Sequence, residues 1–184
     1  EYIHSATAKL LYLAKRNKWE INVSVNHLCT RVGKYTSDDK LKLDRILKYI
    51  NNTKDIPLIL RADLPIQLTG SADAAFGVHP DGKSHTGRSK SLGAGAIDAT
   101  STKQKCVTRS STESELISAS DHVSSLIRTR NFLIHQGYDI GPAILEQDNE
   151  STISLLNKGV YAANRTKHVN IKHLYVTETI ENGE

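Results

Sequence analysis

The order of sequence patterns after Ile66 most constrains the fold of this 184-residue chain, because segments typical of strands come first and helical segments follow. Strands are expected at 66–76, 90–99, 106–109 and 143–147, and helices at 112–137, 150–157 and 170–181. Gly137 ends the long helix, since glycine readily takes the left-handed conformation that follows a helix. This order predicts an α/β fold.

The first third of the chain carries helix signals instead. Residues 5–16 and 36–50 both have apolar side chains at helical spacing, and the second segment opens with the capping sequence TSDD. The pattern from Ile21 fits either a strand or a helix, and we favour a helix. We therefore expect a small, mainly helical segment over 1–65 and a separate α/β domain over 66–184.

Charge is unevenly distributed between these regions. Residues 1–66 hold 12 Lys and Arg against 7 Asp and Glu, whereas residues 67–184 hold 12 against 13. A basic excess beside a near-neutral domain fits either a track for nucleic acid or a solvated helix face, and both interpretations stay open. In the first region, the candidates for contacts with phosphates are Lys42, Arg45 and Lys48.

Other features exclude several classes of protein. No apolar run approaches the roughly 18 to 20 residues that a membrane-spanning helix needs, so no membrane partner is expected. Cys29 and Cys106 lie far apart without a C-x-x-C partner, which excludes a disulfide framework and a zinc cluster. The chain contains no methionine, so we expect it to be part of a longer polypeptide.

Three acidic residues are expected to meet at one edge of the sheet. Asp73 lies in the first strand, Glu115 in the first turn of the long helix, and Asp148 at the end of the fourth strand. Converging carboxylates repel one another unless a cation neutralises them, and such hard oxygen ligands suit Mg²⁺ or Mn²⁺. Two such ions can activate a water and stabilise the leaving oxygen of a phosphodiester, so the set indicates a nuclease. We expect Asp73 and Asp148 to bind the more tightly held ion and Glu115 to face the substrate.

Each carboxylate also has a structural interpretation. Thr112-x-x-Glu115 fits a capping box, and Asp148 followed by Asn149 fits the N-cap of a helix. Asp73 is harder to explain in this way, because a carboxylate inside a partly buried strand needs a partner. Spacing alone leaves both interpretations open.

Four ordered blocks of residues add evidence of family resemblance that the spacing of the carboxylates alone does not provide. The blocks are residues 68–73 (LTGSAD), 110–116 (SSTESEL), 147–151 (QDNES) and 165–171 (RTKHVNI). In order and spacing they resemble the ribonuclease H domain of copia-type (Pseudoviridae-like) retrotransposon polyproteins. Residues 10–14 (LLYLA) and 42–50 (KLDRILKYI) resemble the segment that connects the reverse transcriptase to the ribonuclease H domain in those elements. The resemblance covers nearly the whole chain.

The resemblance implies a mixed five-stranded ribonuclease H fold and hydrolysis of the RNA strand of an RNA–DNA hybrid with two Mg²⁺ or Mn²⁺ ions. Position by position, it implies catalytic roles for Asp73, Glu115 and Asp148. It also implies that the remainder of the reverse transcriptase polyprotein is a partner, and that the protein acts inside the cell in a cytoplasmic virus-like particle. The candidates for nucleic-acid contacts in the fourth block are Arg165, Lys167 and His168.

Two blocks depart from the family pattern. Family members commonly have an aspartate at the fourth acidic position, which here is Asn170. We keep Asn170 as a candidate catalytic residue, because an amide oxygen can bind a hard cation although it brings no formal charge. The first block has Ala75 where a second acid is usual in the family.

These observations leave three hypotheses. The leading one is an active ribonuclease H domain preceded by the tail of a reverse transcriptase. The second is a catalytically impaired domain of the same fold that binds hybrid or serves as a structural spacer, which Asn170 favours. The third is an integrase-like nuclease, which shares the three-carboxylate arrangement but is disfavoured by the basic helical segment and by the absence of a preceding His/Cys module.

Overall fold

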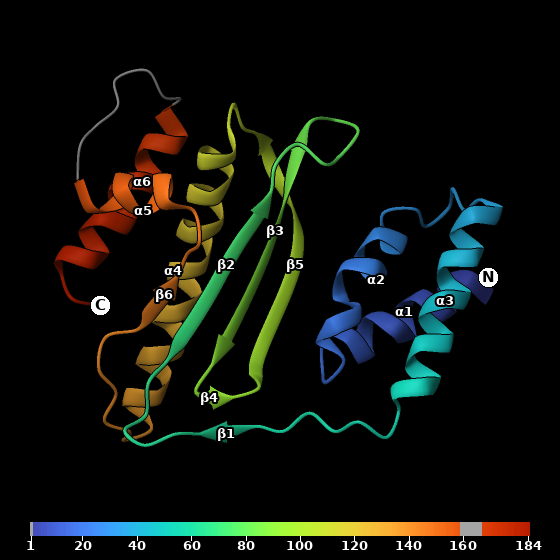
Figure 1. Ribbon diagram of the computed structural model, residues 1–184, viewed down its shortest axis with the longest axis horizontal. Helices are drawn as coiled ribbons and strands as arrows, with labels where there is room; N and C mark the ends of the chain where they lie inside the picture. The colour runs from blue at the N-terminus through green and yellow to red at the C-terminus, as the bar shows by residue number, and fades with distance from the viewer. Residues whose placement is uncertain (1, 159–166) are drawn as a thin grey trace. The chain divides into compact units, whose positions relative to one another are not determined.

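The computed structural model describes residues 2–158 and 167–184. The chain forms two compact units (Figure 1). The first unit comprises residues 1–59 and 99–102, and the second comprises residues 60–98 and 103–184. Each unit has its own cluster of buried apolar side chains.

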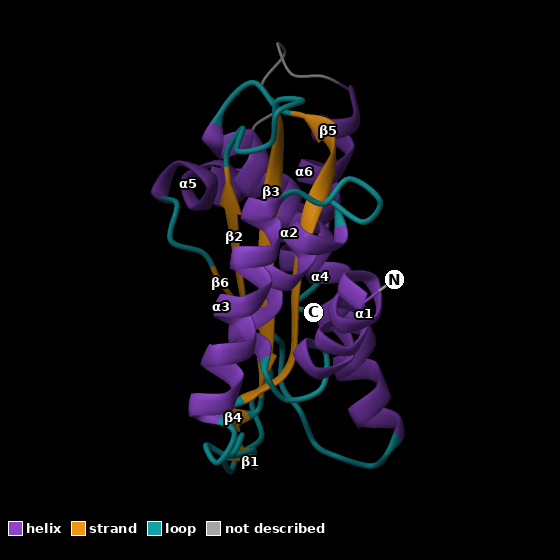
Figure 2. Ribbon diagram, turned by 90° about the vertical axis from the view of Figure 1, so that its right-hand side faces the viewer, coloured by secondary structure: helices purple, strands orange, loops and turns teal. Residues whose placement is uncertain are grey.

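Residues 2–59 of the first unit form helices and no strand, as Figure 2 shows in purple. The elements are α1 (Tyr2–Ala14), the short 3-10 helix η1 (Trp19–Ile21), α2 (Asn22–Cys29) and α3 (Ser37–Thr53). The core of the unit is formed by Leu10, Ala14, Ile21, Val25, Leu28, Leu43 and Ile46. The ambiguous segment that starts at Ile21 is therefore helical, as we expected.

Helix α3 begins at a capping box that also neutralises a buried charge. Thr36 Oγ1 accepts a hydrogen bond from the backbone N of Asp39 at 3.3 Å, and Asp39 Oδ2 accepts one from the backbone N of Thr36 at 2.9 Å. Arg31 Nε donates to Asp39 Oδ2 at 2.9 Å. The hydrogen bond from the Thr36 backbone and the contact with Arg31 lower the pKa of Asp39 to about 2, although Asp39 is only 1% exposed.

The other end of α3 is capped by a lysine. Lys18 is buried, and its Nζ donates to the carbonyl oxygens of Thr53 at 2.7 Å and Ile56 at 3.3 Å. A cation is favourable at this end because the unsatisfied carbonyl groups of a helix carry partial negative charge. The buried charges of Asp39 and Lys18 are thus both compensated within the first unit.

The second unit contains a mixed sheet of four strands in the order β5-β3-β2-β6. Its strands are β2 (Thr69–Ala75), β3 (Lys83–Ser91), β5 (Ala96–Val107) and β6 (Ile144–Glu146). Strand β2 pairs antiparallel with β3 and parallel with β6. A separate antiparallel pair is formed by β1 (Arg61–Ala62) and β4 (Gly93–Ala94). The α/β class is confirmed, but among the described residues this sheet has four strands where five were expected.

The second and third strands differ from the expected boundaries of 90–99 and 106–109. Strand β3 already begins at Lys83, and β5 runs unbroken to Val107. The chain turns between them at Gly93 and Gly95, whose φ angles of 146° and 73° are rare for residues with a side chain. The mainly polar sequence of β3 gave no apolar alternation, so its length could not be recognised.

Strand β6 also differs from expectation. We expected residues 143–147 to form a strand buried by its apolar content, but Ile144 is 49% exposed and Glu146 is exposed. The reason is that only one face of the sheet is covered: Leu145 packs against the core of the second unit, whereas Ile144 and Glu146 lie on the face that also carries the exposed Ser71 of β2.

Helix α4 (Ser111–His135) packs against β2, and the small residues of β2 permit the close approach. A Cβ atom at Gly70 would lie 2.5 Å from His122 Nε2 and 2.7 Å from Leu126 Cδ2. The buried His122 donates through Nε2 to the carbonyl oxygen of Ser89 at 2.9 Å. Burial lowers the pKa of His122 to about 4, so this histidine is neutral at physiological pH.

Helices α5 (Glu150–Lys158) and α6 (Lys167–Glu181) pack on α4 (Figure 1). The core shared by these helices is formed by Leu116, Ile117, Val123, Leu156, Val169 and Val176. An ion pair between Lys172 and Asp121, and a hydrogen bond from Ser124 Oγ to Tyr175 Oη at 3.2 Å, connect α6 to α4. In the described part of the chain, no helix has both the length and the apolar character required to cross a membrane.

Candidate functional site

Asp73 lies in β2, and Asp148 lies at the matching position two residues after the end of the parallel strand β6. Strands β2 and β6 pair with Ser71 opposite Glu146, and the two aspartates follow two residues later in each segment. Side chains along a strand alternate with a period of two, so the register brings both aspartates to the same side. Asp73 lies in the carboxyl-terminal half of β2, the strand whose arrowhead points upward in Figure 1.

Glu115 reaches this end of the sheet from the second turn of α4. Its Oε1 accepts a hydrogen bond from the backbone N of Ala74 at 3.0 Å, and its Oε2 accepts one from Gln147 Nε2 at 3.2 Å. One turn further along the helix, Ser118 Oγ donates to the carbonyl oxygen of Asp73 at 3.1 Å. These contacts fix the start of α4 against the strand that carries Asp73.

The three carboxylates come together in space. One oxygen from each of Asp73, Glu115 and Asp148 lies within 4.8 Å of the other two. The ion pairs found in residues 2–158 and 167–184 leave all three carboxylates out. Three converging hard oxygen donors fit a divalent ion such as Mg²⁺ or Mn²⁺.

The members of the cluster differ in exposure. Asp73 and Asp148 are exposed, whereas Glu115 is only 5% exposed. We expected Glu115 to face the substrate, and the burial contradicts this. The reason is that α4 packs on the covered face of β2, so Glu115 reaches the cluster from beneath the exposed aspartates.

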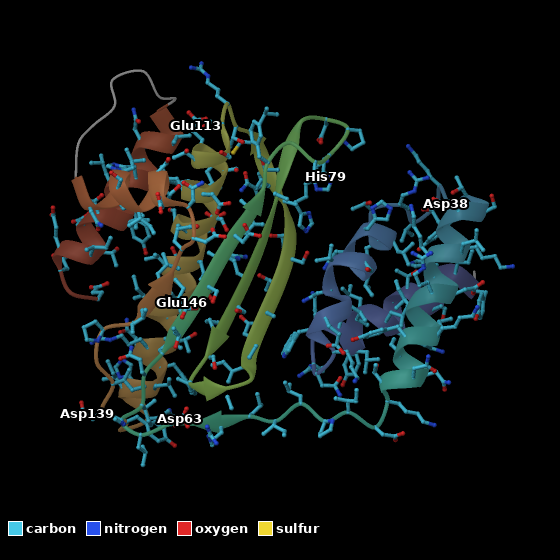
Figure 3. The ribbon with its side chains drawn as sticks, in the orientation of Figure 1. Asp38, Asp63, His79, Glu113, Asp139 and Glu146 are labelled. Atoms are coloured by element: carbon cyan, nitrogen blue, oxygen red, sulfur yellow. The ribbon has the colours of Figure 1, made fainter. Side chains whose placement is uncertain are left out.

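The capping interpretations of Glu115 and Asp148 are wrong, because neighbouring residues make the caps. Helix α4 begins after Ser110, whose Oγ accepts a hydrogen bond from the backbone N of Glu113 at 3.2 Å (Glu113 is labelled in Figure 3). Helix α5 begins after Asn149, whose Oδ1 accepts one from the backbone N of Thr152 at 2.9 Å. Glu115 and Asp148 therefore need another explanation for their positions.

The pKa of Glu115 is raised to about 6. Burial is the main cause, and the nearby charges of Asp73 and Asp148 raise the pKa further, whereas the hydrogen bonds from Ala74 and Gln147 act in the opposite direction. A carboxylate that is buried beside like charges ionises only reluctantly. A bound cation would reverse this effect by favouring the ionised form.

An open groove of about 470 Å³ lies in front of the two exposed aspartates. The side chains and backbone along it include Ser71, Asp73, Gly87, Ser89, Glu146 and Asp148. Gly87 lies opposite Asp73 in the β2–β3 register and has no side chain to narrow the groove. The exposed aspartates are therefore accessible to a large substrate.

Glu146 was not among the expected site residues. Its Oε2 accepts a hydrogen bond from Ser71 Oγ at 2.7 Å, and Figure 3 labels it at the end of β6. Glu146 and Asp148 are two residues apart, and this spacing was the sequence signal that could have placed their side chains on the same face of the sheet. Gln147 was missed as well, since no sequence pattern indicates which neighbours a glutamine amide will find.

The fourth block is described only in part. Asn170 is half-buried in the first turn of α6, so it lies inside the helix that we expected it to begin. Arg165 lies outside the described residues, and the side chains of Lys167 and His168 are likewise not described. The roles of these four residues stay predictions.

The basic candidates of the first unit lie on the solvent side of α3. Lys42, Arg45 and Lys48 are exposed, whereas Leu43 and Ile46 of the same helix are buried. Lys42 forms an ion pair with Asp38 at 2.8 Å, four residues earlier. A role in nucleic-acid binding stays a prediction for all three basic residues.

Comparison with known proteins gives homologues over most of the chain. No family model matches the sequence. The chain is 33% identical over 137 residues to the retrovirus-related Pol polyprotein from transposon TNT 1-94 of Nicotiana tabacum, a match that covers 74% of this chain and 10% of the relative. It is 28% identical over 166 residues to the corresponding polyproteins from transposons RE2 and RE1 of Arabidopsis thaliana, covering 89% of this chain and 11% of each relative. The chain thus spans about a tenth of the length of these curated relatives.

Proposed function

Because homologues of this chain are retrovirus-related Pol polyproteins from copia-type plant transposons, we propose that residues 66–184 are the ribonuclease H domain of such a polyprotein. The reaction is divalent-metal-dependent hydrolysis of the RNA strand of an RNA–DNA hybrid during reverse transcription. The observation that carries the proposal is the convergence of Asp73, Glu115 and Asp148 within 4.8 Å beside an open groove.

The three carboxylates have different roles in this proposal because they differ in exposure. Asp73 and Asp148 bind Mg²⁺ or Mn²⁺ at the groove, where a phosphodiester of the hybrid can reach the same ions. Glu115 adds its charge from beneath and fixes β2 against α4 through Ala74. Bound divalent ions supply activation of the attacking water and stabilisation of the leaving oxygen.

The remaining residues fit the same proposal. Residues 1–65 are the tail of the reverse transcriptase, and Lys42, Arg45 and Lys48 contact phosphates of the hybrid. The partners are the RNA–DNA hybrid and the remainder of the polyprotein. The place of action is a cytoplasmic virus-like particle.

The direct test is cleavage of a hybrid with a labelled RNA strand by the full chain in the presence of Mg²⁺. We expect cleavage of this RNA strand, no cleavage of single-stranded RNA, and loss of activity on chelation. Cleavage of double-stranded DNA instead would favour an integrase-like nuclease. A chain that binds hybrid but leaves every substrate intact would favour the non-catalytic domain.

Asn170 is the observation that favours this second candidate, a hybrid-binding domain or spacer of the same fold. An asparagine contributes no formal charge, so an ion that depends on it is held more weakly than by an aspartate. We expect Asn170→Asp to raise cleavage at limiting Mg²⁺ by about tenfold, which corresponds to about 1.4 kcal/mol. Mn²⁺, which accepts more varied ligands, should partly restore the parent chain. Equal activity of the two chains at limiting Mg²⁺ would show that residue 170 does not act on the ions.

A further inference from the structure

Gln147 connects two of the three carboxylates. It follows β6 directly and precedes Asp148. Its Nε2 donates to Glu115 Oε2 at 3.2 Å, while its Oε1 accepts a hydrogen bond from the backbone N of Asn149 at 3.1 Å. One amide therefore holds Glu115 and the residue that follows Asp148.

The second oxygen of Glu115 makes the matching contact on the other side of the cluster. Glu115 Oε1 accepts from the backbone N of Ala74, the residue that follows Asp73. Each oxygen of Glu115 is thus tied to a position next to another carboxylate. The Ala74 contact uses a backbone group that most residues could supply, whereas the Gln147 contact depends on the side chain.

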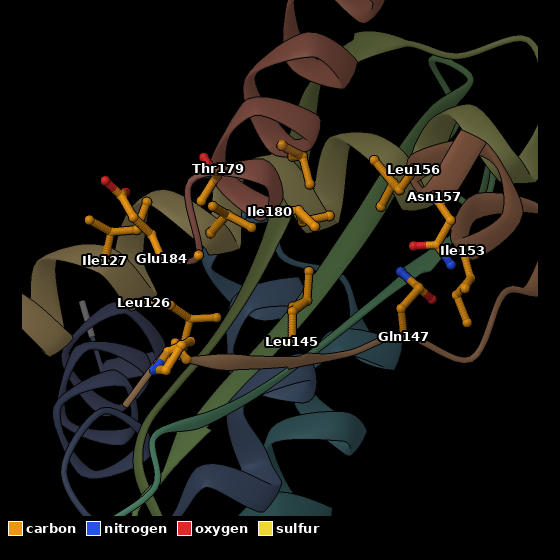
Figure 4. A pocket seen from close by; sticks show the side chains of 15 residues that line it. Leu126, Ile127, Leu145, Gln147, Ile153, Leu156, Asn157, Thr179, Ile180 and Glu184 are labelled. Carbon is orange, nitrogen blue, oxygen red and sulfur yellow. The ribbon is translucent and has the colours of Figure 1, made fainter. Parts of the chain in front are cut away.

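The two hydrogen bonds of Gln147 fix the orientation of its amide. The residue borders a cavity of about 320 Å³, where its neighbours include Leu145, Ile153 and Asn157 (Figure 4), and it also borders the open groove in front of the aspartates. The donor end of the amide meets the carboxylate of Glu115, and the acceptor end meets a backbone N–H, so reversing the amide would break both contacts.

We propose that Gln147 is a positioning residue that holds Glu115 and the Asp148–Asn149 segment at the separation that divalent-ion binding requires. It acts through Glu115 and Asn149 and is not itself a ligand. This inference rests on the proposed function. An amide suits the task because it orients Glu115 without neutralising it, whereas a lysine here would compete with the ion. Partners that orient metal ligands in this way typically contribute 10- to 100-fold to metal affinity.

The test is a double-mutant cycle on the full chain, with Mn²⁺ affinity measured by calorimetry. Gln147→Met keeps the length of the side chain but removes both hydrogen bonds, and we expect about a tenfold or greater loss of Mn²⁺ affinity. In the Glu115→Gln background the same change should cause no further loss, because the partner through which Gln147 acts has been altered. Additive losses, or a Gln147→Met chain that binds Mn²⁺ like the parent, would overturn the proposal.

A matched control is available in the same unit. Gln67 Nε2 donates to the carbonyl oxygens of Pro142 at 2.8 Å and Leu68 at 3.3 Å, ahead of β2 and away from its carboxyl end. We expect Gln67→Met to leave Mn²⁺ affinity unchanged, and an equal loss in this variant would contradict a specific role for Gln147. If Gln147→Met does not fold by circular dichroism, Gln147→Asn replaces it, since this amide is one methylene too short to reach both partners.

Hybrid cleavage separates this inference from the proposed function. In the Gln147→Met chain we expect kcat to fall at limiting Mg²⁺ and to recover at high Mg²⁺, with KM for hybrid unchanged. If the parent chain binds Mn²⁺ but cuts no hybrid, the proposed function is refuted. A loss of Mn²⁺ affinity in Gln147→Met would in that case still support a positioning role for Gln147. A parent chain that cuts hybrid, together with an unaffected Gln147→Met chain, would refute the positioning alone. A parent chain that binds no Mn²⁺ overturns both.

Discussion

The two units contain equally buried carboxylates in opposite electrostatic surroundings. Asp39 in the first unit is 1% exposed and Glu115 in the second is 5% exposed. The backbone of Thr36 and the guanidinium of Arg31 lower the pKa of Asp39 to about 2, whereas burial and two neighbouring aspartates raise the pKa of Glu115 to about 6. Burial raises the pKa of both groups, and it is the partners of Asp39 that reverse the direction of its shift.

The charge of Asp39 has a structural role, whereas the charge of Glu115 suits the binding of a ligand. Asp39 stabilises the fold when ionised, because its partners are built into the same unit. Ionised Glu115 destabilises the metal-free fold, because its carboxylate is buried and because the nearby charges of Asp73 and Asp148 have the same sign. Such an arrangement suits a site where an external cation neutralises the carboxylates.

The largest effect is expected from Asp148→Asn. This change removes one charge from the cluster and should reduce Mg²⁺-dependent cleavage by about 100-fold or more, equivalent to about 2.7 kcal/mol. Hybrid cleavage and Mn²⁺ binding measure the loss. Asp44→Asn, at an exposed position of α3, is the control and should retain full activity. An Asp148→Asn chain that binds Mn²⁺ and cleaves like the parent would remove Asp148 from the site.

The next effect concerns the stability of the metal-free chain. The folded-state pKa of Glu115 lies above its ordinary value of 4.5, so the folded state binds more protons, and stability falls as pH rises from about 4.5 to about 6. Glu115→Gln removes the charge, so stability should no longer fall between pH 4.5 and 6. The change also removes the oxygen that accepts from Gln147 Nε2, so at pH 7 a gain of up to about 2 kcal/mol is offset by the loss of this hydrogen bond. Denaturant unfolding across this pH range measures the effect. Mg²⁺ should stabilise the parent more than the variant, and a variant whose stability falls with pH as steeply as that of the parent would contradict the comparison.

A smaller effect is expected from the exposed basic face of α3. Replacement of Lys42, Arg45 and Lys48 by alanine should weaken hybrid binding by about tenfold at low salt, because each phosphate contact releases bound counterions. The slope of log affinity against log salt concentration should become shallower by up to about 3. Fluorescence anisotropy over a salt series measures both quantities. An unchanged slope would identify this face as merely solvated.

The smallest effect tests the first unit. Thr36→Ala removes the hydroxyl that caps α3 and should destabilise the chain by about 1 kcal/mol. Thr53→Ala, which removes an exposed hydroxyl bonded to the Tyr49 carbonyl, should change stability by less than about 0.5 kcal/mol. Thermal unfolding of both variants gives the comparison. Equal losses would show that the cap at Thr36 has no special importance.

Local patterns predicted much of the fold. The apolar spacing of α3, the long amphipathic run of α4 and the stop at Gly137 depend on neighbours three or four residues apart, which the chain displays directly. Apolar spacing could not reveal the full length of the polar strand β3, because its sequence shows no apolar alternation. The exposure of β6 was missed as well, since tertiary packing decides which face of a strand the helices cover.

The identity of the three carboxylates was readable from the ordered blocks, and the order of strands and helix predicted that they would meet. Tertiary structure alone decided how they differ. The parallel register of β2 and β6 aligns Asp73 with Asp148 at the groove, while Glu115 is buried where α4 packs on β2 and accepts a hydrogen bond from Ala74. The amide of Gln147 reaches Glu115, 32 positions away, only because the tertiary structure brings β6 and α4 together, whereas its contact with Asn149, two residues further on, is local.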